Sequence, residues 1–150
     1  MRVSLDFDDT LTYPEVAEYA AELVDKGIDV WIVTARYDDE KVLKRFGQKM
    51  SNGKIYLPFG AGNDDLYKLA DEIGIPRENI KFTNVQGKGE WFKKHPNFEW
   101  HLEDSPKQIF DIENVSSVPV INVLSRDWKE QAEKLLKKRD YQGYLRNKSQ

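Results

Sequence analysis

Residues 3–12 read VSLDFDDTLT, so an apolar, partly β-branched segment runs directly into three carboxylates. Residues 2–7 are predicted to form a buried strand. Asp6, Asp8 and Asp9 are therefore crowded together where that strand ends. Like charges this close repel and raise each other's pKa, so their crowding does not favour folding. We expect either a positive group among these carboxylates or a reaction that uses them.

The rest of the chain alternates between strand and helix patterns. Short apolar segments predict strands over residues 2–7, 28–33, 80–83, 98–102 and 118–123. Helical spacing predicts helices over residues 14–26, 38–49, 64–73, 88–94 and 106–112, and a last amphipathic helix that contains Trp128 and Leu136. This alternation predicts an α/β fold of the Rossmann-like type, a three-layer α/β/α sandwich around a five-stranded parallel sheet.

The chain is predicted to be a single domain over residues 1–150, because no linker, repeat or low-complexity run divides it. Residues 51–62, SNGKIYLPFGAG, are the one irregular stretch. We expect them to form a small flap or insertion, with a short extended piece at 55–59. Residues 129–150 are expected to form a C-terminal helix and tail.

Composition excludes several classes of protein. The chain has no cysteine, which excludes disulfides and thiolate metal sites and fits a reducing cytoplasm. No apolar run approaches the roughly 20 residues of a membrane span, so no membrane partner is expected. The sequence begins with the first strand, which leaves no room for a signal peptide. We therefore predict a cytoplasmic protein.

The charge of the chain is unevenly distributed. The net charge of −3 argues against a dedicated polyanion binder. Residues 129–150 nevertheless contain seven basic and three acidic side chains, a local charge of +4 that leaves −7 for the rest. A solvated last helix is the favoured interpretation, and contact with a phosphate backbone is the alternative.

Polar side chains stand where the predicted strands end. Ligands of open parallel sheets bind outside the carboxyl ends of the strands, so this edge is the place to look for a site. The residues at strand ends or in the loops after them are Asp6 and Asp8, Thr34 in VTAR, Lys88 in NVQGKG, and Glu103 and Asp104 in HLEDSP. One hydroxyl, one ammonium and four carboxylates are thus expected on one rim.

This set of groups suits phosphate chemistry. A phosphate dianion cannot approach bare carboxylates without a cation between them, and oxygen-only ligands suit Mg²⁺. Lys88 can neutralise further charge, and the Thr34 hydroxyl with nearby backbone N–H groups can bind phosphoryl oxygens. An aspartate can attack phosphorus to give an aspartyl-phosphate. The sequence therefore predicts Mg²⁺ as cofactor and a phosphorylated substrate.

The set resembles the haloacid dehalogenase superfamily of phosphatases, over nearly the whole chain. The matches to its four motifs, in chain order, are Asp6, Asp8 and Thr10 (DxDxT), then Thr34, then Lys88, then Glu103 with Asp104. The resemblance implies that Asp6 is the nucleophile and a metal ligand. It implies that Asp8 is the general acid and base, with its carboxyl turned away from the metal, which takes its backbone carbonyl. Thr10 is expected to support the site.

Phosphate binding and the fourth motif are assigned by the same resemblance. Thr34, Ala35, Arg36 and Lys88 are expected around the phosphate, although a surface ion pair of Arg36 with Asp38 or Asp39 is as good an interpretation. EDSP also resembles the DNSP of small phosphatases that act on the RNA polymerase tail, whose second position holds the metal. Asp104 is therefore expected to be the direct ligand and Glu103 to act indirectly.

The spacing of the motifs leaves no room for a cap domain, since one helix and one strand fill the chain between Asp8 and Thr34. Capless relatives act on large substrates with an exposed phosphate, or on small ones closed off by a partner subunit. Nucleotides, nucleic-acid ends, phosphoproteins and small metabolites all stay open, and a nucleotide or nucleic-acid end is favoured.

Two other classes of function stay as alternatives. A phosphorylatable receiver domain also uses Asp, Thr, Lys and a metal, but in receivers the lysine comes last, whereas Lys88 precedes the final acidic pair. The second alternative is a binding module that kept the fold and lost the catalytic activity. Asp9 is expected to serve the turn, and His95 and His101 are expected to be structural or exposed.

Overall fold

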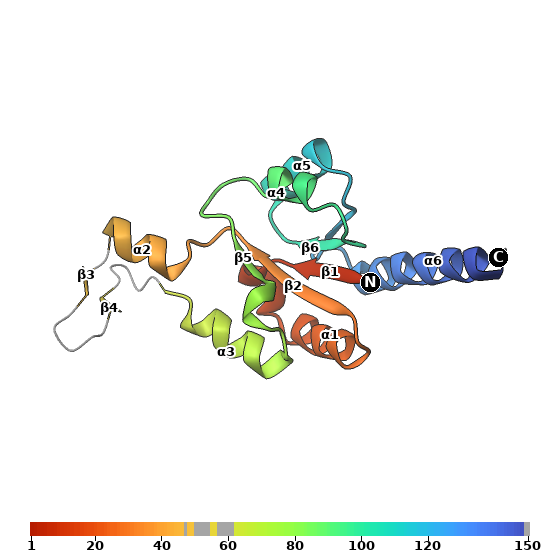
Figure 1. Ribbon diagram of the computed structural model, residues 1–150, viewed down its shortest axis with the longest axis horizontal. Coiled ribbons are helices and arrows are strands. Elements are labelled where there is room, and N and C mark those ends of the chain that lie inside the picture. Colours follow the sequence, from red (N-terminus) through yellow and green to blue (C-terminus); the bar gives the residue numbers. More distant parts are fainter. Residues whose placement is uncertain (47, 50–54, 57–61, 149–150) are drawn as a thin grey trace.

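The core of the fold is a five-stranded sheet in which all strands are parallel (Figure 1). The computed structural model describes residues 1–46, 48–49, 55–56 and 62–148. The strand order is β5-β2-β1-β6-β7. Its strands are β1 (Arg2–Leu5), β2 (Asp29–Thr34), β5 (Ile80–Phe82), β6 (His101–Glu103) and β7 (Val120–Asn122). The predicted α/β fold with a five-stranded parallel sheet is confirmed.

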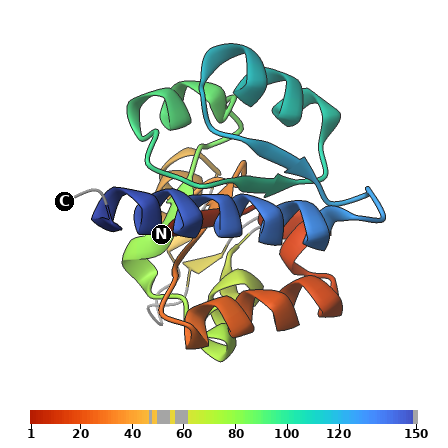
Figure 2. The ribbon, with the colours of Figure 1, turned by 90° about the vertical axis from the view of Figure 1, so that its right-hand side faces the viewer.

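Helices cover both faces of the sheet (Figure 2). One face carries α1 (Pro14–Asp25), α3 (Asp64–Ile73) and the first turns of α6 (Trp128–Lys148), and the other carries α4 (Gly89–Lys94) and α5 (Pro106–Val115). Each face has its own apolar cluster: the first includes Val3, Leu23 and Leu136, and the second includes Phe92 and Ile112. The later turns of α6 project beyond the sheet (Figure 1).

The ends of the helices follow from local chemistry. Pro14 occupies the first turn of α1, where its missing N–H would have no partner inside the helix. Gly74 ends α3 with a φ of 98°, a left-handed conformation that glycine adopts without steric penalty. Ser105 caps α5, because its hydroxyl accepts a hydrogen bond from the backbone N–H of Gln108 at 3.4 Å.

The helix predicted over 38–49 is wrong at its C-terminal end. α2 spans Asp39–Phe46, and β3 (Gln48–Lys49) pairs with β4 (Ile55–Tyr56) in an antiparallel hairpin. A hairpin partner that comes later in the chain decides this boundary, which helical periodicity cannot reveal. Of the flap predicted at 51–62, only β4 and Gly62 are described, and the remainder lies outside the described residues.

The strand predicted at 98–102 also begins later than expected, because β6 is His101–Glu103. The preceding residues already contact β1 in an irregular way: the Glu99 N–H donates to the Arg2 carbonyl, and the Ser4 N–H donates to the Trp100 carbonyl. As a result Glu103 lies within the strand and not in the loop after it. A short 3₁₀ turn, η3 (Arg77–Asn79), precedes β5.

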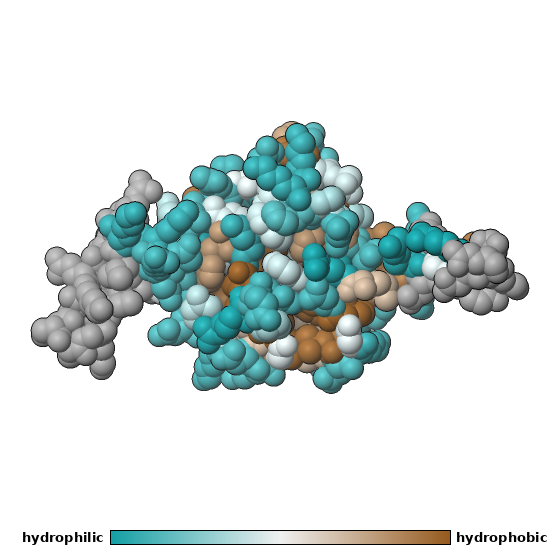
Figure 3. All heavy atoms as spheres, in the orientation of Figure 1, coloured by the Kyte–Doolittle hydropathy of each residue, from teal (hydrophilic) through white to brown (hydrophobic). Residues whose placement is uncertain are grey.

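The surface is mostly hydrophilic over α3, α4 and α5 in the view of Figure 3. This agrees with the 33% of charged residues in the chain. Within the described part of the chain, no helix combines the length and the apolar character that crossing a membrane requires.

Candidate active site at the carboxyl ends of the strands

The loop after β1 points its carboxylates in different directions. It forms a single irregular turn, η1 (Phe7–Leu11), in which Asp9 has a φ of 54°. Aspartate tolerates this left-handed conformation better than most residues do. Asp6 is buried, whereas the side chain of Asp8 is 54% exposed. The three crowded carboxylates of the sequence are therefore divided between the interior and the solvent.

An acidic cluster forms where β1 and β6 end side by side. The Asp6 N–H donates to the Leu102 carbonyl at 2.9 Å, which brings Asp6 next to Glu103 and Asp104. One carboxylate oxygen from each of these three residues lies within 4.8 Å of the other two. The Thr10 hydroxyl donates to Asp104 Oδ1 at 3.3 Å. Three carboxylates this close, at the ends of two neighbouring strands, could offer a metal ion ligands that are all oxygen atoms.

Lys88 supplies a buried positive charge within this cluster. Its side chain is only 1% exposed, and its Nζ lies 2.9 Å from Asp6 Oδ1 and 2.5 Å from Glu103 Oε1. The residue stands at the start of α4, where its backbone N–H donates to Gln108 Oε1 at 3.0 Å. Lys88 thus contacts one carboxylate that follows β1 and one that ends β6.

Behind Glu103 lies a buried histidine that sequence reasoning assigned no role in the site. Burial lowers the pKa of His101, so the imidazole is neutral near pH 7. His101 Nε2 lies 2.9 Å from Glu103 Oε1, and Nδ1 lies 2.8 Å from the Ser4 hydroxyl. The neutral ring therefore donates from Nε2 to the carboxylate and accepts from Ser4. The signal was present, because His101 and Glu103 are two residues apart on one strand and face the same side.

The carboxyl groups of Asp6 and Glu103 have pKa values that are shifted in opposite directions. Burial raises the pKa of Glu103, but the hydrogen bond from His101 and the Lys88 ammonium outweigh it, so that the pKa is well below its usual range. Burial raises the pKa of Asp6 to about 9, against the lowering influence of Lys88, and Glu103 raises it further. Lys88 is shared between the two carboxylates and lies closer to Glu103, at 2.5 Å, than to Asp6, at 2.9 Å. The three carboxylates and one ammonium together carry a formal −2 when ionised, which matches one divalent cation.

Asp8 belongs to a second, exposed cluster built around Arg36. The guanidinium binds both oxygens of Asp8, at 2.8 and 2.9 Å, and both oxygens of Asp65, also at 2.8 and 2.9 Å. Its Nη1 also donates to the Gly62 carbonyl at 3.3 Å. The hydrogen bonds from Arg36 lower the pKa of Asp65. The ion pair considered for Arg36 from sequence, with Asp38 or Asp39, gives way to pairs with two more distant aspartates.

Thr34 ends β2 beside these clusters and is 1% exposed. Its hydroxyl accepts a hydrogen bond from the Arg36 N–H at 3.3 Å. The carbonyl of Ala35 accepts from the Val85 N–H at 2.6 Å, so this end of β2 is held by the loop that leads to Lys88. The structure thus places direct contacts among Asp6, Thr10, Lys88, Glu103 and Asp104, and a separate set among Thr34, Arg36 and Asp8.

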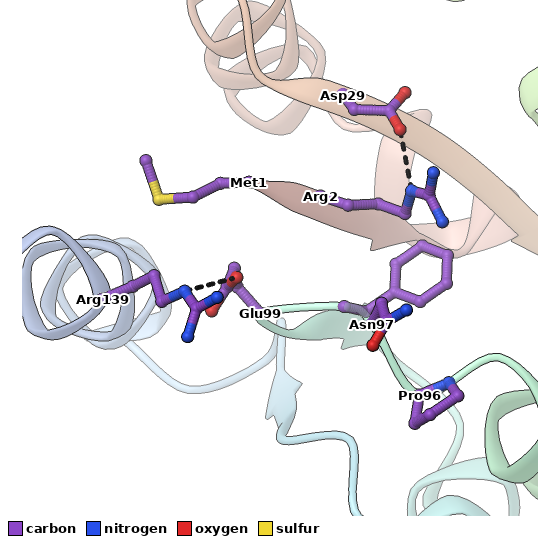
Figure 4. Close-up of a pocket in the computed structure, with 8 residues that line it drawn as sticks. Met1, Arg2, Asp29, Pro96, Asn97, Glu99 and Arg139 are labelled. Carbon is purple, nitrogen blue, oxygen red and sulfur yellow. Dashed lines mark hydrogen bonds and ion pairs between the residues drawn. The ribbon is translucent and has the colours of Figure 1, made fainter. Parts of the chain in front are cut away.

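A hollow of about 520 Å³ lies at the opposite edge of the sheet, beside Met1 at the start of β1 (Figure 4). Its charged groups neutralise one another: Arg2 pairs with Asp29 at 2.7 Å and Arg139 with Glu99 at 3.6 Å (Figure 4). Paired charges at the amino ends of the strands offer little to a charged ligand. We therefore place the candidate site at the carboxyl ends.

No protein-family model and no curated protein sequence matches this chain. The resemblance to the haloacid dehalogenase superfamily thus stays a prediction carried by the four sequence motifs. The functional argument rests on the geometry of the two clusters.

Proposed function

We propose that this chain is a Mg²⁺-dependent phosphomonoester hydrolase of the haloacid dehalogenase type, acting through an aspartyl-phosphate on Asp6. The observation that carries the proposal is the arrangement of two aspartates two residues apart. Asp6 is buried between Lys88 and the acidic pair, whereas Asp8 faces solvent. A nucleophile held beside a cation, with a separate exposed carboxyl for proton transfer, is what phosphomonoester hydrolysis needs.

The donor set fits a magnesium ion. Asp6 and Asp104 would hold it, because Glu103 is already engaged: one of its oxygens contacts Lys88 and His101, and the other accepts from the Ser105 N–H at 3.3 Å. The ion would favour the ionised form of Asp6, whose pKa burial raises to about 9. It would also neutralise the residual charge of the cluster and so allow a phosphate dianion to approach. The backbone carbonyl of Asp8 stays a predicted further ligand.

The proposed reaction has two steps. A carboxylate oxygen of Asp6 attacks phosphorus in line, the bond from phosphorus to the leaving oxygen breaks, and protonated Asp8 gives its proton to that oxygen. Asp8 then takes a proton from water, whose oxygen attacks the aspartyl-phosphate. Inorganic phosphate leaves, and Asp6 returns as a carboxylate. Lys88, 2.9 Å from Asp6, offsets negative charge during both steps.

Arg36 must release Asp8 before the first step. Both oxygens of Asp8 accept from the guanidinium, so Asp8 can carry a proton to the leaving oxygen only after it separates from Arg36. Asp65 keeps both of its hydrogen bonds to Arg36 in that event, and Gly62 keeps its own. The guanidinium therefore stays in place while Asp8 moves, ready to bind a substrate oxygen.

A panel assay tests the proposal. Purified protein with Mg²⁺ should release inorganic phosphate from p-nitrophenyl phosphate and from at least one natural class: nucleotides, phosphorylated oligonucleotides, sugar phosphates or phosphopeptides. We favour a phosphate on a nucleotide or nucleic-acid end. Chelation by EDTA should abolish release, and added Mg²⁺ should restore it. Absence of release from every member of the panel would contradict the proposal.

We expect Asp104 to bind the metal and Glu103 to stabilise the fold. Asp104→Asn should raise the Mg²⁺ concentration for half-maximal activity by about tenfold or more, since it weakens a ligand without disturbing the buried network. Glu103→Gln should instead lower the thermal midpoint, because it removes the ionised partner of Lys88 and His101. Titrating activity with Mg²⁺ and measuring thermal unfolding on both variants separates the roles. The opposite ranking would make Glu103 the metal ligand.

Asp8→Asn should reduce turnover most where the leaving group is poor. An alkyl phosphate needs a proton on its departing oxygen, whereas p-nitrophenolate leaves without one, so the loss should be about 10²-fold or more on the alkyl ester and clearly smaller on the aryl ester. Single-turnover rates on the two esters measure this. Equal losses on both would remove Asp8 from the acid role.

A further inference from the structure

A cationic hollow lies along the edge strand β5 and is lined in part by the loop that leads to Lys88. Its volume is about 260 Å³, and its walls include Lys41, Lys81 and Lys94 together with the aromatic residues Phe82 and Trp91. The two aromatic side chains are partly exposed. Among the described residues that line it, Glu90 is the one carboxylate, so these residues carry a formal +2 within a chain of net −3.

The ammonium groups of this hollow are available to a ligand. Among the ion pairs whose two members are both described, none includes one of the three lysines. The basic residues of α6 differ in this respect, because Lys129 lies 3.9 Å from Glu22 and Arg139 pairs with Glu99. Unpaired positive charge gathered around a concavity attracts an anion.

One loop joins the hollow to the candidate site. The loop after β5 contributes Thr83, Asn84, Gln86 and Gly87 to the wall of the hollow. Lys88, the next residue, reaches Asp6. Asn84 and Val85 have φ values of 57° and 68°, a strained conformation for a β-branched residue. Hydrogen bonds from their N–H groups to the Arg36 and Ala35 carbonyls hold this conformation. An anion in the hollow would therefore lie one loop away from Lys88.

We propose that the hollow is a second anion subsite that takes an internal phosphate of a single-stranded nucleic acid whose terminal phosphate enters the candidate active site. The inference rests on the proposed function and narrows its substrate. A positively charged groove with partly exposed aromatic side chains is the usual combination for binding single strands. A small monophosphate fills one anion site, whereas a strand offers a further phosphate at each nucleotide.

The hollow replaces the C-terminal segment as the expected contact for a nucleic acid. The carboxyl ends of the strands point away from the later turns of α6, which project at the other end of the molecule (Figure 1). Lys134 and Lys137 of that helix are exposed and line a different hollow. They provide a control with an identical change in charge.

The test compares Lys81→Gln/Lys94→Gln with Lys134→Gln/Lys137→Gln. On 5′- and 3′-phosphorylated dT₁₂, the first double variant should lose about tenfold or more in kcat/KM. The slope of log kcat/KM against log salt should become shallower by about 1.4, at about 0.7 for each neutralised contact to a single strand. Turnover of p-nitrophenyl phosphate should be unchanged, and the control variant should match wild type on every substrate.

Binding is measured separately, so that failure of the subsite and failure of the proposed function are distinguishable. Fluorescence anisotropy with labelled, unphosphorylated dT₁₂ should show weaker binding to Lys81→Gln/Lys94→Gln than to the control, whether or not any substrate is hydrolysed. Equal binding by both variants, or equal loss of oligonucleotide turnover in both, would overturn the subsite. A loss confined to phosphopeptide substrates would overturn its assignment to nucleic acid.

Discussion

Asp6→Asn should lower turnover by roughly 10³-fold or more on every substrate that the wild-type chain hydrolyses with Mg²⁺. The amide keeps the shape of the side chain but cannot form the aspartyl-phosphate, so the reaction loses its nucleophile. The variant should still fold, since Glu103 remains as a counterion of Lys88. Steady-state phosphate release and a thermal melt on the same preparation measure the two effects.

Asp9→Asn is the matched control for this change. The residue lies in the same loop and loses the same charge, and asparagine tolerates its φ of 54° as well as aspartate does. Activity should stay within about twofold of wild type. If Asp6→Asn also kept near-wild-type turnover on a good substrate, the covalent mechanism would be wrong even if the chain proved to be a phosphatase.

Lys88→Met should destabilise the fold by roughly 3–5 kcal/mol, the usual loss when one partner of a buried ion pair is removed. The apolar side chain fills much of the same volume, but it leaves Glu103 and Asp6 without their shared cation. Urea unfolding measures the difference. Lys93→Met, an exposed position on the same helix, should change stability by no more than about 0.5 kcal/mol.

The pH dependence of this loss has a definite sign. The folded wild-type chain holds the pKa of Glu103 below its ordinary value of 4.5. The stability that this ionised carboxylate contributes is therefore present above pH 4.5 and is lost as the pH falls through the lowered value. The difference between Lys88→Met and wild type should be largest near neutral pH and shrink in acid. A difference that grew in acid would mean that Lys88 is not compensating a carboxylate.

The sequence predicted the parts of this molecule that depend on local patterns. Apolar segments separated by helical ones are enough to predict the sheet, and the rule for parallel sheets places Asp6, Thr34 and Lys88 at one edge. The contact of His101 with Ser4 was missed because it depends on register: the two residues are 97 apart in the chain and face each other only once β1 pairs with β6. No local pattern carries that information.

The partners of Arg36 were missed for a related reason. Sequence proximity suggested Asp38 and Asp39, but the guanidinium reaches Asp8, 28 residues before it, and Asp65, 29 residues after it. The end of α2 was placed too late because β3 pairs with β4, later in the chain. In each case a contact between distant residues overrides what the neighbouring residues alone would favour.

The hydrogen bonds at the base of the segment after β2 have a consequence for how such a chain can change in evolution. Arg36 contacts Gly62 and Asp65, and the Asn63 amide donates to the Tyr37 carbonyl at 2.9 Å. Residues 36–37, where the segment after β2 begins, are thus hydrogen-bonded to residues 62–65, where it ends. Doubling the length of a flexible loop between fixed ends costs only about 0.6 kcal/mol. Insertions between residues 37 and 62 should therefore be tolerated. New recognition elements could be acquired there while Asp6, Lys88 and the sheet stay unaltered.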